Sequence, residues 1–214
     1  MEQFQARLTM EALKAAENVD AYFASLAEEL FQYYVIQKEE TQYWLTDIEF
    51  YLYHKQRRDI ITYPRNCKAG EWFFHPSGVD LAFESFVKKE GKKPTLTDDA
   101  FFGGILVRGI QKKDRKGDLP FDGPMLACEE LFDKFDAFGE VKNFPKLLRV
   151  SEPLPYDKPE PEKRFNIKKD AEEKVSSILS NNYTPLRDEH LKDELIQAYR
   201  HYLEKPYRYR RYSR

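Results

Sequence analysis

The chain has 214 residues, a length that commonly forms one domain around a single core. Of these residues 41% are hydrophobic and 15% aromatic, which is enough for a core and excludes a wholly disordered chain. The formal net charge is −2, yet the last ten residues hold five bases and no acid. Because no apolar run approaches the ~18 residues of a membrane-spanning helix, we expect a cytoplasmic protein that does not use a membrane.

The first 33 residues predict a helical segment. Apolar residues recur at intervals of three and four from Thr9 to about Tyr34, which is the spacing of an amphipathic helix. Thr9 and Asn18 are both suitable N-caps, so the helix either runs through Asn18 or breaks there.

Residues 34–150 predict a sheet core. The segment 33–53 is rich in β-branched and aromatic residues that alternate around a charged patch, which predicts a β-hairpin. Two further strand-like runs are separated by the Pro-Ser-Gly turn at residues 76–78, and residues 101–111 predict another strong strand. Gly123-Pro124 then opens a helix, because proline suits the first turn of a helix.

The last third of the chain predicts an extended surface connection over residues 151–168, which is rich in proline and charge. C-terminal helices and a basic strand follow over residues 169–214, with helices near Lys169 to Leu179 and near Arg187 to Leu203. Strands in the first two thirds and helices at the ends indicate one α+β domain with a mainly antiparallel sheet.

Asp47 and Glu49 lie two residues apart in a predicted strand, so their side chains share one face with Tyr51. A carboxylate beside aromatic rings can act as a general base, although the same spacing fits ordinary carboxylates on a solvent face. Arg108 lies inside an apolar strand. A buried guanidinium there requires either a carboxylate partner across the sheet or an anionic ligand.

The four histidines are too scattered for a metal site, and only His75, at a strand end, is expected near a functional site. The phosphate-binding, dinucleotide-binding and serine-hydrolase motifs are absent from the sequence. We therefore expect neither a metal nor an organic cofactor.

The last ten residues interleave tyrosines with bases. This pattern fits nucleic-acid binding, in which bases neutralise phosphates and aromatic rings stack on nucleobases. It fits equally well a terminal strand whose tyrosines pack inward and whose arginines face solvent.

The order of these features resembles the alkyladenine (3-methyladenine) DNA glycosylase family. The shared pieces are Asp47-Ile48-Glu49-Phe50-Tyr51, Pro64-Arg65-Asn66, Gly78, Ile105-Leu106-Val107-Arg108, Gly123-Pro124 and Pro206-Tyr207-Arg208-Tyr209. They occur in the family's order over roughly residues 27–214. The resemblance implies the family's curved antiparallel sheet with flanking helices, and DNA as the partner.

The resemblance also implies roles for four residues. Glu49 would activate the water that attacks the sugar carbon, and Tyr51 would stack on the extruded base. Arg108 would contact the DNA backbone near the flipped nucleotide, and His75 would lie near the opposite wall of the pocket.

Two positions depart from the family pattern. Ser77 stands where the family has a tyrosine that fills the gap left by the flipped base, and Glu84 stands where the family has a pocket asparagine. Glu84 is therefore expected to face the substrate. The bases expected to contact nucleic acid are Arg57, Arg58, Arg65, Arg208, Arg210 and Arg211.

These observations predict a glycosylase that removes an alkylated or deaminated purine from DNA, with Glu49 as the general base. One alternative is a non-catalytic protein on the same scaffold that binds nucleic acid or a small planar ligand, which the serine at position 77 favours. Another is an enzyme on a different small substrate that uses Glu49 and Glu84 as a carboxylate pair.

Overall fold

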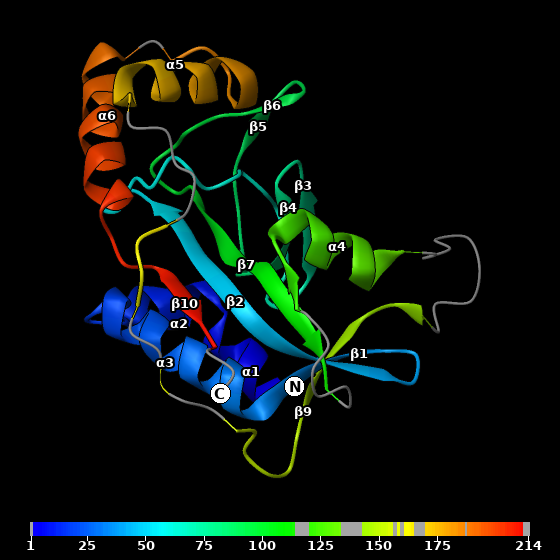
Figure 1. Ribbon diagram of the computed structural model, residues 1–214. Helices are drawn as coiled ribbons and strands as arrows, with labels where there is room; N and C mark the ends of the chain where they lie inside the picture. The colour runs from blue at the N-terminus through cyan, green and yellow to red at the C-terminus, as the bar shows by residue number, and fades with distance from the viewer. Residues whose placement is uncertain are drawn as a thin grey trace.

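The computed structural model describes residues 2–113, 120–133, 143–155, 158, 161–164, 170–186 and 188–211. These residues form an α+β structure in which helices flank a curled antiparallel sheet shaped like a half-barrel (Figure 1). The predicted fold class, a mainly antiparallel curved sheet with flanking helices, is confirmed.

The main sheet is built on two long neighbouring strands, β2 and β7. Its strands are β1 (Tyr34–Lys38), β2 (Thr41–His54), β3 (Trp72–His75), β4 (Gly78–Ala82), β7 (Phe101–Lys112), β8 (Phe121–Asp122), β9 (Lys146–Arg149) and β10 (Arg208–Arg210). Their order is β3-β4-β7-β2-β1-β9, with β10 beside β2 and β8 beside β7, and every pairing is antiparallel. The predicted hairpins β1–β2 and β3–β4 and the predicted strand β7 are confirmed.

Four short strands were not predicted, and one of them, β8, pairs with β7. Strand β9 pairs with β1, and the small hairpin of β5 (Lys89–Glu90) and β6 (Lys93–Pro94) forms a separate two-stranded sheet. Their sequences carry only two to four residues each, too few for an alternating pattern to be recognised.

The N-terminal segment forms α1 (Glu2–Arg7), α2 (Met10–Ala15) and α3 (Val19–Tyr33). The side chain of Thr9 accepts a hydrogen bond from the backbone of Ala12, and that of Asn18 accepts one from Ala21. Each cap begins a helix, because it satisfies a backbone donor that would otherwise lack a partner. The predicted helix therefore breaks at Asn18, and α1 is an addition to the prediction.

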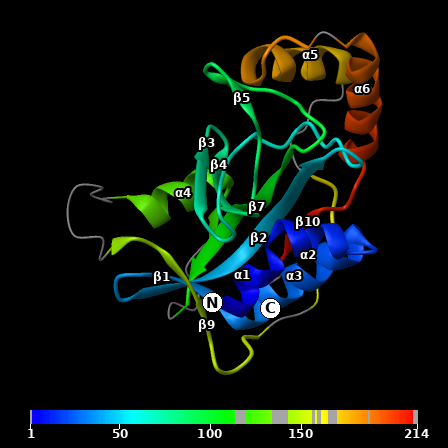
Figure 2. The same ribbon diagram turned by 180° about the vertical axis from the view of Figure 1, so that it is seen from behind.

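The N-terminal helices cover the apolar face of the sheet (Figure 2). The ring of Phe23 on α3 stacks on that of Phe50 on β2 with centroids 4.6 Å apart. Tyr207 meets Phe23 edge-on, and Tyr209 on β10 meets Phe50 edge-on. Tyr207 and Tyr209 thus pack into the core, as one of the two interpretations of the tail predicted, but Arg208 and Arg211 are buried as well instead of facing solvent.

The remaining helices are α4 (Pro124–Phe132), α5 (Ala171–Asn182) and α6 (Glu189–Leu203). Helices α5 and α6 contain a second apolar cluster that also takes in Tyr53 of β2 and Phe102 of β7, whose rings stack 4.7 Å apart. This cluster lies where β2 ends and β7 begins (Figure 1). The predicted helices are confirmed, although the predicted starts at Lys169 and Arg187 lie outside the described residues.

The described part of the extended connection, within residues 151–164, contains no helix or named strand, and Glu162 forms a single bridge to Arg208. No helix in the described ranges is both long enough and apolar enough to cross a membrane.

Candidate functional site

The two faces of the sheet differ in chemistry. Strand pairing places Glu49 opposite Leu106 and Leu106 opposite Asp80, so these three side chains form one row across β2, β7 and β4. The neighbouring residues Ile48 and Phe50 point to the other face, into the apolar core. The face that carries Glu49 and Asp80 therefore holds the polar groups, away from the N-terminal helices.

Glu49 is fully buried and lies at the centre of this polar face. Its Oε2 accepts hydrogen bonds from Nη1 of Arg108 at 3.0 Å and from the hydroxyl of Tyr51 at 2.8 Å. The predicted carboxylate partner of Arg108 is confirmed. The interpretation of Asp47 and Glu49 as solvent-facing carboxylates is wrong, because the exposed fractions of their side chains are 2% and 0%.

A register irregularity explains the position of Arg108. Asp47 pairs with Gly109 and Ile48 pairs with Val107, so Arg108 is an extra residue of β7 with no opposite residue in β2. Bulges of this kind re-aim a side chain. As a result the Arg108 guanidinium reaches both carboxylates of β2, with Nε 3.8 Å from Oδ2 of Asp47.

Asp47 has a second guanidinium partner in the C-terminal strand. Nη2 of Arg208 donates to Oδ2 of Asp47 at 2.6 Å, and Nε of Arg210 lies 3.6 Å from the same oxygen. Two buried carboxylates and two buried arginines therefore alternate in one ionic cluster. Such a cluster is tolerated in the interior because each charge has an opposite charge within contact distance.

Tyr51 connects this cluster to a cavity. Burial, followed by the nearby Glu49 carboxylate, raises the pKa of the Tyr51 hydroxyl well above its ordinary value. The hydroxyl therefore stays protonated and serves as a donor to Glu49. The guanidinium of Arg164, which is paired with Asp59, lies 4.5 Å from the centre of the Tyr51 ring.

A second ionic group lies on the same face, on β3 and β4. Nη1 of Arg65 donates to Oδ2 of Asp80 at 2.5 Å, and Nε2 of His75 lies 2.9 Å from Oδ1 of Asp80. Burial acts to raise the pKa of Asp80, but Arg65 and His75 outweigh it and lower that pKa below its ordinary value. The ring of His75 stacks on Tyr63 with centroids 4.6 Å apart.

A cavity of about 690 Å³ lies over these two ionic groups, between the polar face of the sheet, α4 and α5. Its lining includes the predicted residues Tyr51, His75, Arg65 and Arg108, together with Ser77. Tertiary structure thus brings together four predicted residues from different strands and loops. Glu49 lies directly behind Tyr51 and Arg108 rather than in the lining itself.

The structure corrects the position of Glu84. This residue is exposed, and its Oε2 accepts a hydrogen bond at 2.9 Å from the backbone of Met10, the first residue of α2. Its own backbone donates to Leu8 in the turn between α1 and α2. Glu84 is therefore bound to the N-terminal helices and is not part of the cavity lining, so it does not form a carboxylate pair with Glu49.

The structure also corrects the expected basic surface. Arg65 and Arg208 are buried in the ion pairs described above, and Arg211 is buried with hydrogen bonds to backbone carbonyls that include Leu45. Arg57 is buried among aromatic rings, with its guanidinium 4.9 Å from the centres of Tyr202 and Tyr207. These four arginines stabilise the fold from within and do not supply an exposed patch.

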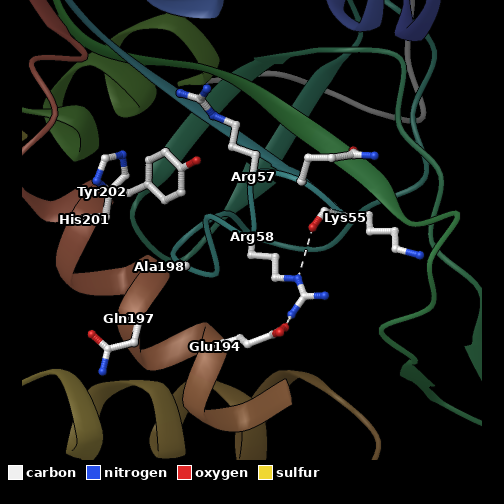
Figure 3. A pocket seen from close by; sticks show the side chains of 9 residues that line it. Lys55, Arg57, Arg58, Glu194, Gln197, Ala198, His201 and Tyr202 are labelled. Carbon is white, nitrogen blue, oxygen red and sulfur yellow. Dashed lines mark hydrogen bonds and ion pairs between the residues drawn. The ribbon is translucent and has the colours of Figure 1, made fainter. Parts of the chain in front are cut away.

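Arg58 lies beside a second hollow, of about 420 Å³, between the turn after β2 and helix α6. Figure 3 shows Arg58 reaching Glu194 of α6 and the Lys55 carbonyl, while the Arg57 guanidinium lies near Tyr202. Arg210 is partly exposed and has two carboxylates nearby. Among the predicted nucleic-acid contacts, Arg58 and Arg210 are thus the ones that retain access to solvent.

Several cavity residues were not predicted. Tyr63 and Asp80 line it from the sheet side, and Lys174, Ser177 and Asn181 line it from α5. Asp80 carried a recognisable signal, since a charged residue inside the buried strand β4 requires a partner in the same way as Arg108. The α5 residues carried none, because nothing in their spacing indicates what their helix faces.

In the part of the chain that the structure describes, no three His, Cys, Asp or Glu side chains are grouped in a way that could hold a metal ion. The two cysteines are partly exposed and not bonded to each other.

No protein-family model matches the chain, and no solved structure matches it. The chain is similar to an uncharacterized protein of Acanthamoeba polyphaga mimivirus, with 24% identity over 128 residues. The match covers 54% of this chain and 58% of that protein. The chain therefore spans less than two thirds of the relative, whose description assigns no activity.

Proposed function

We propose that the cavity binds a purine base and that the protein hydrolyses the N-glycosidic bond of an alkylated or deaminated purine in DNA, with Glu49 as the general base. The observation that carries the proposal is the arrangement of Glu49, Arg108 and Tyr51, in which a buried carboxylate accepts hydrogen bonds from two residues that line the cavity. A likeness to the fold of the alkyladenine DNA glycosylases is part of this proposal.

The walls of the cavity suit a flat ring. Tyr51 lies on one strand, and the stacked rings of Tyr63 and His75 lie across the sheet from it. Aromatic walls bind a base that has left the stack, because stacking replaces the neighbours the base has lost. At the same wall, the ionised side chain of Asp80 supplies hydrogen-bond acceptors and the guanidinium of Arg65 supplies donors.

The proposed reaction uses one water molecule, which would reach the buried Glu49 carboxylate between the Tyr51 and Arg108 side chains that line the cavity. Glu49 takes a proton from the water as its oxygen bonds to the sugar carbon, and the bond from that carbon to the base nitrogen breaks. The electron pair of the broken bond leaves with the base, which is then protonated. Arg108 provides positive charge beside Glu49 and at the cavity wall, where it is suited to the sugar–phosphate backbone.

The experiment that tests the proposal is base release from duplex oligonucleotides that contain ethenoadenine, hypoxanthine or an alkylated purine. We expect abasic sites with the unaltered protein and none above background with Glu49→Gln, because the amide cannot accept the proton. Glu84→Gln is the matched control, since Glu84 is exposed and outside the cavity lining. This control is expected to release base at the rate of the unaltered protein.

Circular dichroism and thermal unfolding of both variants must accompany the assay, because Glu49→Gln removes one partner of a buried ion pair. A folded Glu49→Gln variant with undiminished base release would exclude Glu49 as the general base. Absence of release from all substrates by the folded, unaltered protein would refute hydrolysis.

A second candidate function is binding of nucleic acid or a small planar ligand without hydrolysis. Two observations favour it: the arginines expected at a DNA interface are mostly buried, and Ser77 at the cavity edge has no side chain large enough to fill the gap left by a flipped base. Salt-sensitive binding of an oligonucleotide that contains ethenoadenine, without base release, would support this candidate.

A further inference from the structure

Helix α5 presents a polar face to the cavity. Lys174, Ser177, Ile178 and Asn181 all line it, and their spacing of three, four and seven residues places them on one side of the helix. The residues Val175 and Leu179 are buried in the second apolar cluster. One side of α5 is therefore held by packing, and the polar side forms a wall opposite Tyr51 and Arg108.

The charges of the lining do not balance. Its cations are Arg65, Arg108 and Lys174, whereas Asp80 is its carboxylate. Arg65 is bonded to Asp80, and Arg108 is bonded to Glu49 behind the wall. Lys174 is different: within the described ranges no carboxylate lies at ion-pair distance from its ammonium group. The uncompensated positive charge of the cavity is thus on α5.

We propose that Lys174 binds a phosphate of the ligand, and that Ser177 and Asn181 donate hydrogen bonds to its sugar or phosphate oxygens. The cavity would then take a nucleotide rather than a bare base or a nucleoside. This inference rests on the proposed function, in which the ring lies between Tyr51 and His75. It assigns the phosphate contact to α5, instead of to the arginines of the C-terminal strand.

The size and chemistry of the cavity agree with a nucleotide. Its volume of about 690 Å³ lies within the range of small-molecule sites. An ammonium group on a flexible stem is a common phosphate ligand, since it adapts its donors to the oxygens it meets. The phosphate can belong to a free mononucleotide or to a nucleotide within a DNA strand, and the test separates these sources.

The test compares three fluorescent probes: ethenoadenosine, its 5′-monophosphate, and a single-stranded oligonucleotide with one ethenoadenine. Binding is measured with the unaltered protein, with Lys174→Gln and with Lys192→Gln. Lys192, on α6, is the matched control, because it is partly exposed, outside the cavity lining and 3.9 Å from Glu189. All variants are checked for folding by circular dichroism.

We expect Lys174→Gln to weaken binding of at least one phosphate-bearing probe by about tenfold, the loss of one charge-assisted contact. Binding of ethenoadenosine and all binding by Lys192→Gln should stay unchanged. An effect on the monophosphate identifies a free nucleotide as the source, and an effect on the oligonucleotide alone identifies a DNA strand.

Equal affinities of Lys174→Gln and the unaltered protein for both phosphate-bearing probes would overturn the inference. In that case Tyr51→Ala separates the two proposals. If it weakens ethenoadenosine binding, base binding in the cavity stands without the phosphate contact. Failure of the unaltered protein to bind any of the probes would refute base binding and the phosphate contact together.

Discussion

Nη1 of Arg108 lies 3.0 Å from Oε2 of Glu49 on the neighbouring strand. The same oxygen accepts a hydrogen bond from the Tyr51 hydroxyl, and the Glu49 side chain is fully buried. Removing either charge leaves the other without its main partner in the interior. We expect Arg108→Leu and Glu49→Leu each to lower the free energy of unfolding by about 3–5 kcal/mol. The double variant should lose clearly less than the sum of these two losses, because no buried charge is stranded.

Urea unfolding of the unaltered protein, both single variants and the double variant measures this coupling. A coupling free energy near zero would show that the two side chains do not stabilise one another in solution.

The pH dependence of stability should depend on Asp80. Its pKa in the folded protein is lower than the ordinary value of 3.8, because Arg65 and His75 outweigh the effect of burial. The stabilisation is therefore complete above pH 3.8 and is lost as the pH falls through the lower pKa of the folded state. The free energy of unfolding is measured for the unaltered protein and for Asp80→Asn between neutral and acidic pH. The difference between the two free energies should shrink in this acidic range. A difference that stays constant there would contradict the assignment.

Gly103 on β7 permits the close approach of β2. A Cβ atom at this position would lie 2.4 Å from the carbonyl oxygen of Tyr51 and 2.8 Å from the ring of Phe83. We expect Gly103→Ala to lower stability by about 1–3 kcal/mol or more, because a backbone carbonyl cannot rotate away. In Gly109→Ala the atom nearest to the new Cβ is the Thr46 hydroxyl oxygen at 2.6 Å, and this hydroxyl can rotate away. The midpoint of thermal unfolding should therefore fall less in Gly109→Ala than in Gly103→Ala. Similar losses in both variants would refute this explanation.

The arginines should separate into two groups by stability. Arg208→Ala removes the nearest of the arginines around the buried Asp47 and is expected to lower the free energy of unfolding by about 3–5 kcal/mol. Arg58→Ala removes a partly exposed pair with Glu194, for which about 0–1 kcal/mol is expected. Chemical denaturation of both variants tests this contrast. Equal losses would mean that the Arg208–Asp47 pair is solvated in solution.

Tyr51→Phe separates the ring of this residue from its hydroxyl. The ring wall of the cavity stays, whereas Glu49 loses a hydrogen bond of 2.8 Å. Since a hydrogen bond to a charged group contributes about 1.5–3 kcal/mol, stability should fall by this amount. Ethenoadenosine affinity, measured by fluorescence, should change little. A large loss of affinity in a folded Tyr51→Phe variant would show that the hydroxyl binds the ligand directly.

Local spacing was sufficient to predict most of the elements. Alternation with period two identified the hairpin β1–β2 and strand β7, and the same parity placed Glu49 and Tyr51 on one face. The caps Thr9 and Asn18 marked two of the three N-terminal helices, since a capping side chain satisfies donors within its own turn. These features depend only on residues a few positions apart in the chain, so they can be read from the sequence.

The partners of the charged side chains could not be predicted in this way. Arg208 bonds to Asp47 at a separation of 161 residues, and Arg108 bonds to Glu49 at a separation of 59. The register shift at Arg108 was not predicted, and it brings the Arg108 guanidinium within reach of both Asp47 and Glu49. An alternating tail of tyrosine and arginine looks the same in sequence whether its arginines face phosphate, solvent or a buried acid.

The sequence therefore established the class of fold, the strands that carry Glu49 and Arg108, and the face that Glu49 shares with Asp47 and Tyr51. It did not establish that Arg57, Arg65 and Arg208 are buried, or that α5 closes a cavity with Lys174. The physical reason is that side-chain direction follows from local backbone geometry, whereas burial and charge pairing depend on which distant segments the folded chain brings into contact.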